Sequence, residues 1–498
     1  MTKKTAAAAA LVLAVPLLGA APAEAKPLAF GPCPFEGAEC AELAVPLDER
    51  HPEDEIMISI SRVRATGTPE EYRGALLVNP GGPGGSGLEY AVSKGAKLPE
   101  QVRRAYDIVG FDPRGVGRSA PLDCGDLGGL FQHPSPEPVP AGPDQERAHL
   151  DRLSAQARDC LRHNPNAAAM NTTSTARDMD RIRDALGEEE LNFLGVSYGT
   201  YLGAAYAHEF PENVGRMVLD SAVSPDRWHD FDVLQAHAML HQRDILFDWI
   251  AARPDLGLGT TREEVRDTYT RARASLSSAD DDFGAGSRNA FGAGARNAFG
   301  AGAQNAFGAG EFDNLVYKTL SRTERWRPFA EALRTYVGSG STEALEPALP
   351  EPDPESRNYE AALRTVKCND SARPTPEEVL ADIRALRAAD PHPILTGLEA
   401  TTCAFWPNPA EPARLGHPDM PPVLLTQADH DPTTPLPGAR RMQALLPGSR
   451  MITARNTYSH GVVASQNLPC VDDPTATYLL TGQLPVRNTT CPGPGLPT

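Results

Sequence analysis

Gly195-Val196-Ser197-Tyr198-Gly199 is the most informative run in this chain of 498 residues. A short apolar run from residue 191 predicts a buried strand before it, and the residues up to 210 predict a helix after it. A serine between two glycines at a strand-to-helix turn forms a sharp bend that lifts its hydroxyl clear of the sheet. The helix also directs its partly positive N-terminal end at the reacting atom. We therefore predict that Ser197 is a nucleophile; the alternative is an ordinary strand–turn–helix glycine pair.

Short apolar runs alternate with helical stretches on both sides of this motif. The predicted strands are 75–79, 107–111, 191–195, 216–220, 422–426 and 450–454. Strands that alternate with helices favour the α/β class, in which helices cover both faces of a mostly parallel sheet.

The strand pattern stops after Asp220 and resumes near residue 422. The residues between are largely polar and helical, over a length more typical of a domain than of a loop. We therefore expect a sheet core in two parts, 26–223 and 416–498, with a large, mainly helical cap, 224–415, inserted after the strand that ends at Asp220.

A short repeat lies inside this insertion. Phe-Gly-Ala-Gly begins at Phe283, Phe291, Phe299 and Phe307. Glycine and alanine with one aromatic residue per unit bury too little surface to offset the chain entropy lost on ordering. We interpret 278–310 as a flexible Gly/Ala loop expanded by duplication; a functional lid is the alternative.

The N-terminus has the pattern of a secretory signal. Lys3 and Lys4 precede an apolar stretch, 6–18, that is short for a membrane span, and Ala23-Glu24-Ala25 offers a cleavage site. We expect 1–25 to be a signal peptide and the protein to be secreted and extracellular; a retained anchor helix is the alternative.

The formal net charge of −18 argues against nucleic-acid partners and against stable association with anionic membranes. We expect a monomer.

All eight cysteines follow the predicted cleavage site, and export permits disulfides. Spacing suggests neighbour pairs, 33–40, 124–160, 368–403 and 470–491, among the many connectivities that eight cysteines allow.

A second motif, the glycine-rich run 79–87, follows the first strand of the α/β series. Such a loop lets backbone N–H groups approach a ligand without obstruction by side chains. An oxyanion hole at a nucleophile elbow uses the N–H after the nucleophile, here Tyr198, and one from this earlier loop. We predict Gly82 as the second donor, with Gly81 next. The run lacks the ending of a P-loop and the spacing of a dinucleotide site.

A nucleophilic serine needs a base, and the base needs an orienting acid. His460 follows the last of the strands predicted above and is the predicted base. Asp431 follows the strand before it and is the predicted acid. Asp429, two residues earlier, and Asp220, at the end of an earlier strand, are alternatives. The run 112–119, which contains Arg114, has a predicted structural role in holding a loop near the site.

Together these residues resemble the secreted tripeptidyl aminopeptidases of actinobacteria, relatives of the proline iminopeptidases with the α/β-hydrolase fold. The matching segments are 81–87, 112–119, 195–200, 218–221, 366–370, 431–435 and 459–461. The likeness spans nearly the whole predicted mature chain. Asn79-Pro80 replaces the histidine found before this glycine run in proline iminopeptidases, which favours the tripeptidyl branch.

The resemblance implies a serine exopeptidase that releases short peptides, such as tripeptides, from free N-termini without a metal or cofactor. The cap would close one end of the site, and Asp370 is the candidate partner of the substrate amine. Proline iminopeptidase-type release of single residues and a secreted esterase or lipase are the alternatives, with a non-catalytic binding protein as the different class.

Overall fold

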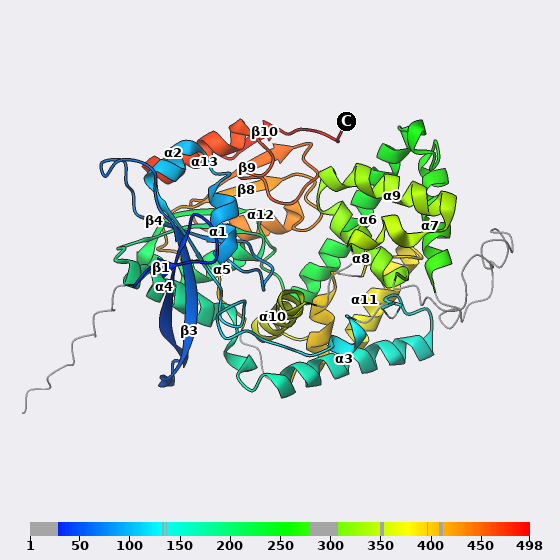
Figure 1. Cartoon of the computed structure of the whole chain (residues 1–498), viewed down its shortest axis with the longest axis horizontal. Helices are drawn as coiled ribbons and strands as arrows, with labels where there is room; N and C mark the ends of the chain where they lie inside the picture. The colour runs from blue at the N-terminus through cyan, green and yellow to red at the C-terminus, as the bar shows by residue number, and fades with distance from the viewer. Residues whose placement is uncertain are drawn as a thin grey trace, which may run out of the picture.

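A computed structural model describes residues 28–131, 134–135, 137–277, 307–348, 353–395, 397–407 and 412–498. The predicted signal peptide and most of the Phe-Gly-Ala-Gly repeat therefore lie outside the described residues. Within these ranges the chain forms a sheet core and a helical cap, which occupy opposite sides of the view in Figure 1.

The ten strands of the described residues form one sheet in the order β1-β2-β3-β5-β4-β6-β7-β8-β9-β10. From β5 to β10 each strand pairs in parallel with its neighbour, whereas β1, β2 and β3 pair antiparallel at one edge. The strands are β1 Gly31–Pro32, β2 Glu39–Asp48, β3 His51–Val63, β4 Ala75–Asn79, β5 Asp107–Phe111, β6 Leu191–Val196, β7 Val214–Asp220, β8 Leu424–Ala428, β9 Arg450–Arg455 and β10 Thr489–Pro492.

Helices cover both faces of the sheet, and the cap adds a further group of helices beyond it (Figure 1). The helices of the core segments are α1 Leu88–Gly95, α2 Glu100–Ala105, α3 Pro143–His163, α4 Thr172–Leu186, α5 Tyr198–Glu209, α12 Leu436–Ala444 and α13 Pro469–Thr481. Those of the cap are α6 Trp228–Ala251, α7 Arg262–Leu276, α8 Ala309–Leu320, α9 Trp326–Ser339, α10 Pro354–Asp370 and α11 Pro376–Ala389, with the short 3-10 helices η5 Thr323–Arg325 and η8 Glu399–Phe405. The predicted α/β-hydrolase architecture with a helical cap after the strand ending at Asp220 is thus confirmed.

The six predicted strands are present, and each agrees with the structure to within two residues at either end. Strands β1, β2, β3 and β10 were not predicted from the sequence. Strand β3 begins with a charged, exposed run, His51 to Glu55, so only its second half has the apolar residues that identified the parallel strands. These strands lie at the two edges of the sheet, where less of a strand is buried.

The cap has a hydrophobic core of its own, built from α6, α7, α8 and α9. Phe307, the first residue of the last repeat unit, is buried in this core, and Ala309 begins α8. The predicted flexible loop therefore extends too far at its C-terminal end, because an aromatic side chain at this position finds apolar neighbours. Helix α3 also lies along the cap, where Glu146 pairs with Arg384 of α11.

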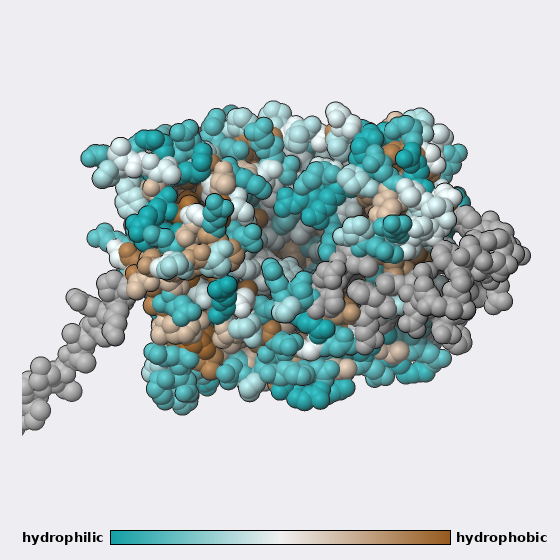
Figure 2. All heavy atoms as spheres, viewed as in Figure 1, coloured by the Kyte–Doolittle hydropathy of each residue, from teal (hydrophilic) through white to brown (hydrophobic). Residues whose placement is uncertain are grey.

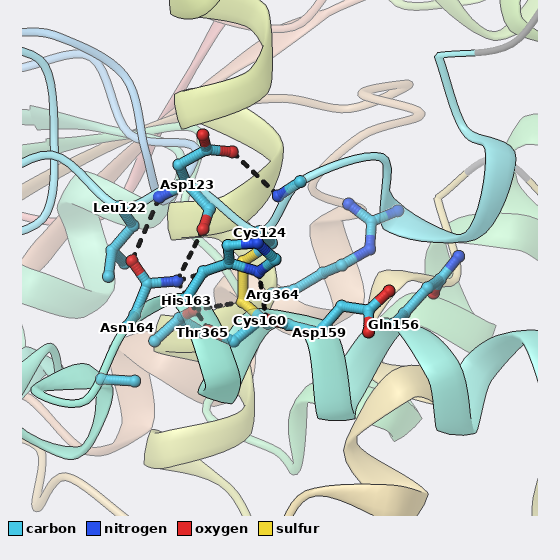
Figure 3. The surroundings of a disulfide bond; sticks show 12 residues. Leu122, Asp123, Cys124, Gln156, Asp159, Cys160, His163, Asn164, Arg364 and Thr365 are labelled. Atoms are coloured by element: carbon cyan, nitrogen blue, oxygen red, sulfur yellow. Dashed lines mark hydrogen bonds between the residues drawn. A yellow bond between two sulfur atoms is a disulfide. The ribbon is translucent and has the colours of Figure 1, made fainter.

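The four predicted cysteine pairs are disulfide-bonded, Cys33–Cys40, Cys124–Cys160, Cys368–Cys403 and Cys470–Cys491. Figure 3 shows that Cys124–Cys160 joins the loop before α3 to its last turns. Asn164 reinforces this link, since its side chain donates to the carbonyl oxygens of Asp123 (2.8 Å) and Cys160 (2.7 Å). Cys368–Cys403 joins α10 to η8 within the cap.

The face of the molecule drawn in Figure 2 is mainly hydrophilic, with apolar residues in scattered small groups. Among the helices of the described residues, none combines the length and the apolarity needed to cross a bilayer.

Candidate active site

Ser197 occupies a strained bend between β6 and α5. Its φ is +59°, in the left-handed region that residues with a side chain rarely adopt. A Cβ atom added to Gly195 would lie 2.3 Å from the carbonyl oxygen of Gly199, and one added to Gly199 would lie 2.9 Å from Oδ1 of Asn79. Both positions therefore require glycine, and the bend has the geometry of a nucleophile elbow.

The glycine-rich loop after β4 lies directly against this elbow. A Cβ atom on Gly81 would approach the carbonyl oxygen of Val196 to 2.4 Å and the backbone nitrogen of Tyr198 to 2.9 Å. Gly82 lines the same cavity as Ser197. The N–H groups of Gly82 and Tyr198 have no acceptor among the described residues, so both remain available to a ligand oxygen.

Asp112, which follows β5, holds the far end of this loop. Its carboxylate accepts hydrogen bonds from the Ser86 hydroxyl (2.5 Å), the Gly87 N–H (3.1 Å) and the Arg118 N–H (2.8 Å). Burial raises the pKa of Asp112, although these three donors oppose the rise. Arg114 pairs through both its Nε and an Nη with Asp178 at 2.7 Å, away from the cavity, in the structural role expected for it.

His460 and Asp431 meet through a short polar contact. Nδ1 of His460 lies 2.9 Å from Oδ2 and 3.1 Å from Oδ1 of Asp431. The aspartate side chain is fully buried and accepts hydrogen bonds from the N–H groups of Thr433 and Thr434, both at 2.9 Å. The imidazole is thereby fixed, and it borders the cavity that contains Ser197.

The two alternative acids have other partners. Asp429 accepts hydrogen bonds from the N–H groups of Asn456 (3.0 Å) and Thr457 (3.1 Å) and so shapes the turn after β9. Asp220 accepts from the N–H groups of Val462 and Val463, just after His460. Both acids therefore brace the histidine loop, whereas Asp431 contacts the imidazole.

One cavity of about 260 Å³ lies between the sheet core and the cap. The core contributes Pro80, Gly82, Ser197, Val223, Thr433 and His460 to its lining. The cap contributes Trp228, Phe231, Gln235, Tyr317, Ser321, Arg322, Tyr359, Leu363, Lys367 and Glu399. The cavity thus brings together a serine hydroxyl and an imidazole that is bonded to a carboxylate, and two N–H groups without an acceptor belong to the same part of the core. These are the parts needed for acyl transfer.

A buried charge cluster borders the cavity on the cap side. The ammonium of Lys367, on α10, lies 2.7 Å from Asp232 of α6 and 2.8 Å from Oε2 of Glu399 at the start of η8. The other oxygen of Glu399 has no donor among the described residues. Burial raises the pKa of Asp232 to about 7; the Lys367 ammonium opposes this rise and Glu399 adds to it. With both carboxylates ionised, the cluster carries one net negative charge.

The structure places Asp370, the predicted amine partner, outside the cavity lining. Its carboxylate accepts hydrogen bonds from the N–H (2.9 Å) and the hydroxyl of Thr172, at the start of α4. The Thr172 hydroxyl also contacts the Tyr198 hydroxyl at 2.5 Å. Burial raises the pKa of Asp370 to about 7, and Thr172 opposes the rise. Asp370 thus joins α10 to α4. The acid that lines the cavity is Glu399.

The acidic cluster on the cap side of the site was not predicted from the sequence. Glu399, Lys367 and Asp232 come from three segments far apart in the chain, and no local pattern links them. One signal was present: Lys367 precedes Cys368, whose predicted disulfide partner Cys403 lies close to Glu399 in sequence. That pairing brings α10 to η8 and thereby the lysine to the glutamate.

A model of the alpha/beta hydrolase fold family matches residues 74–460 of this chain. The chain is 36% identical over 473 residues to a tripeptidyl aminopeptidase of Streptomyces lividans, and the match covers 91% of this chain and 83% of that protein. It is 30% identical over 475 residues to the serine protease Hip1 of Mycobacterium tuberculosis, with 91% and 87% covered. It is 31% identical over 491 residues to carboxylesterase B of Mycobacterium tuberculosis, with 91% and 86% covered.

Proposed function

Because the chain belongs to the α/β-hydrolase family and is a serine hydrolase of the aminopeptidase type, we propose that it is a secreted exopeptidase that releases tripeptides from free peptide N-termini. The observation that carries this proposal is that Ser197, His460 and Glu399 line one cavity, to which both the core and the cap contribute. The disulfides support secretion, since such bonds persist in oxidising compartments.

In the proposed mechanism, Nε2 of His460 takes the proton of Ser197 as the hydroxyl attacks the scissile carbonyl. Asp431 holds the imidazole in the required tautomer and stabilises its charged form. The N–H groups of Gly82 and Tyr198 donate to the oxyanion, with each donor contributing on the order of 3 kcal/mol. His460 then protonates the leaving amine, and water releases the acyl group from Ser197.

Glu399 is the proposed partner of the substrate ammonium. A buried cluster of two carboxylates and one lysine has one negative charge that nothing in it compensates, and a buried charge is costly unless it is paired. The free N-terminus of a peptide supplies the missing positive charge. Because Glu399 lines the cavity and Lys367 bonds to only one of its two oxygens, the ammonium would bind there without displacing Lys367.

The cap gives the site its exopeptidase character in this proposal. Trp228, Phe231 and Tyr359 give the cap side of the cavity an aromatic lining, and Glu399 lines the same side. A peptide whose ammonium binds Glu399 then places its scissile carbonyl at Ser197 after a fixed number of residues. The length of the released peptide follows from the distance between these two groups.

The test uses purified protein and peptide anilides of one, two and three residues with free or acetylated N-termini. We expect turnover of the three-residue substrate with a free N-terminus, and Ser197→Ala should lower its kcat by at least about 10⁴-fold while the circular dichroism spectrum is retained. Glu399→Gln should raise KM for the free substrate at least about tenfold. The matched control Glu377→Gln, at an exposed position on α11, should leave KM unchanged.

Each other outcome points to a different activity. Preferred cleavage of the one-residue anilide would indicate proline iminopeptidase-type release. Rapid turnover of p-nitrophenyl esters with poor turnover of every anilide would indicate an esterase. Substantial peptidase activity in Ser197→Ala would refute the assignment of the nucleophile.

A further inference from the structure

Arg322 is a cation of the cavity that the proposed function leaves without a role. It lies between α8 and η5, lines the cavity with Ser197 and His460, and is half-buried. Its guanidinium has no hydrogen-bond or ion-pair partner among the described residues. By contrast, Arg273 in the same cap pairs with Asp313. A guanidinium held beside a cavity without a counterion is a site for an anionic group.

The neighbours of Arg322 fix it on the histidine side of the cavity. The carbonyl oxygen of Ser321 accepts a hydrogen bond of 3.0 Å from the N–H of His460. Thr323 donates through its N–H to the hydroxyl of Ser459 at 3.0 Å. Arg322 is therefore held between two residues that are each bound to the loop carrying the imidazole.

The charges of the acidic cluster and of Arg322 act on different tyrosines. Burial raises the pKa of Tyr317, and the charge of Glu399 adds to the rise. Burial also raises the pKa of Tyr90, on α1; there the charge of Asp220 adds to the rise and that of Arg322 opposes it. The charge of Glu399 thus acts on Tyr317 of α8, whereas the charge of Arg322 acts on Tyr90 of α1.

We propose that Arg322 binds a carboxylate on the part of the peptide that leaves, so that the preferred substrates are short peptides with a free C-terminal carboxylate or an acidic residue after the scissile bond. The inference rests on the proposed function, in which His460 protonates the leaving amine. Residues after the scissile bond must therefore lie on the side of His460, where Arg322 is held. The planar guanidinium matches a carboxylate through two parallel hydrogen bonds.

The two sources of the carboxylate can be separated with three pentapeptides that release the same tripeptide. The first has a free C-terminus, the second a C-terminal amide, and the third a C-terminal amide with glutamate in place of the residue after the scissile bond. For the wild-type protein we expect kcat/KM to be about tenfold higher for the first or the third peptide than for the second. Which of the two is favoured identifies the source.

Arg322→Gln should reduce this preference to less than twofold. Arg322→Lys should retain part of it, because lysine keeps the positive charge but cannot form two parallel hydrogen bonds with a carboxylate. Raising the salt concentration should weaken the preference in the wild-type protein. Arg325→Gln is the matched control: Arg325 is exposed in the adjacent turn and bonds to the carbonyl oxygen of Lys318. It should retain the full preference.

Equal kcat/KM for the three peptides in the wild-type protein, or the same preference in Arg322→Gln, would overturn the inference. The proposed function would fail differently, since the wild-type protein would then cleave neither these peptides nor the tripeptide anilide. An Arg322→Gln protein that does not fold leaves the wild-type comparison and the salt dependence to decide.

Discussion

The backbone N–H of His460 donates a hydrogen bond of 3.0 Å to the carbonyl oxygen of Ser321. The first residue belongs to the loop after β9 in the core, and the second follows α8 in the cap. A second bond joins the same parts, because Gln242 of α6 donates to the carbonyl oxygen of Tyr458 at 2.7 Å. The cap is therefore hydrogen-bonded to the loop that carries the proposed base, and the position of the cap affects that of the imidazole.

Gln242→Leu tests this link. The substitution leaves the carbonyl oxygen of Tyr458 without this donor, a loss of about 1 to 2 kcal/mol for a buried group. We expect kcat on a tripeptide anilide to fall about fivefold with little change in KM. The control is Gln443→Leu, a partly exposed glutamine on α12 that bonds to Asn488 away from the cavity. An unchanged kcat in folded Gln242→Leu would mean that the cap does not position the histidine.

Asp431→Asn should lower kcat by about 10⁴-fold, because an amide in place of the carboxylate favours the wrong imidazole tautomer and cannot stabilise the charged form. Asp429→Asn should cost less than about tenfold in kcat, since Asp429 bonds to backbone N–H groups of the turn and not to the imidazole. The measurement is kcat for both variants, with thermal unfolding to verify folding. The reverse order of effects would identify Asp429 as the acid.

The core residues of the candidate site could be predicted from the sequence because they occur in a fixed order along the chain. Ser197, Asp431 and His460 each follow a buried strand whose apolar run marks its end, and parallel strands present these ends at one edge. The loop with Gly82 follows another such strand. Local patterns were therefore enough to place these residues together.

The cap residues of the site could not be predicted from the sequence, because no fixed order along the chain tells which residues of the cap helices reach the site. Asp370 and Lys367 lie three residues apart on α10, yet Lys367 borders the cavity and Asp370 bonds to Thr172. A choice between them depends on how α10 packs against α4 and α6, and the sequence does not encode that packing in any short pattern. Arg322 could not be predicted either, because no sequence motif marks its position after α8.

Loss of the Cys368–Cys403 disulfide should weaken substrate binding as well as stability. The bond joins α10 to η8 and so keeps Lys367 beside Glu399. For a closed loop of this length we expect the double variant Cys368→Ser, Cys403→Ser to lose on the order of 3 to 4 kcal/mol of unfolding free energy. KM for a free tripeptide anilide should rise several-fold at a temperature where the variant is folded.

The matched control for this variant is removal of Cys470–Cys491, which joins α13 to β10 away from the cavity. We expect a similar loss of stability without a change in KM. Denaturant unfolding and steady-state kinetics on the two double variants provide the comparison. A KM that rises equally in both would show that the effect is general loosening rather than a shift of the charge cluster.

The affinity for free N-termini should depend on pH through Asp232, whose pKa burial raises to about 7. Below that pH, Asp232 holds a proton and the cluster with Lys367 and Glu399 has no net charge. Above it, the cluster gains one negative charge and attracts the substrate ammonium, which itself loses its proton above about pH 8. We therefore expect KM to be lowest between about pH 7 and 8 and to rise up to about tenfold by pH 6.

Asp232→Asn should flatten KM between pH 6 and 7, whereas Asp230→Asn, at an exposed position on the same helix, should not. Stability should change in a related way. The pKa of Asp232 is higher in the folded protein than the value of about 3.9 in an unfolded chain, so its contribution to stability is full below about pH 4 and is lost as the pH rises to about 7. Unfolding free energies measured between pH 4 and 8 should show this loss in the wild-type protein and less of it in Asp232→Asn. An identical pH dependence of KM in the two proteins would mean that another group governs binding of the amine.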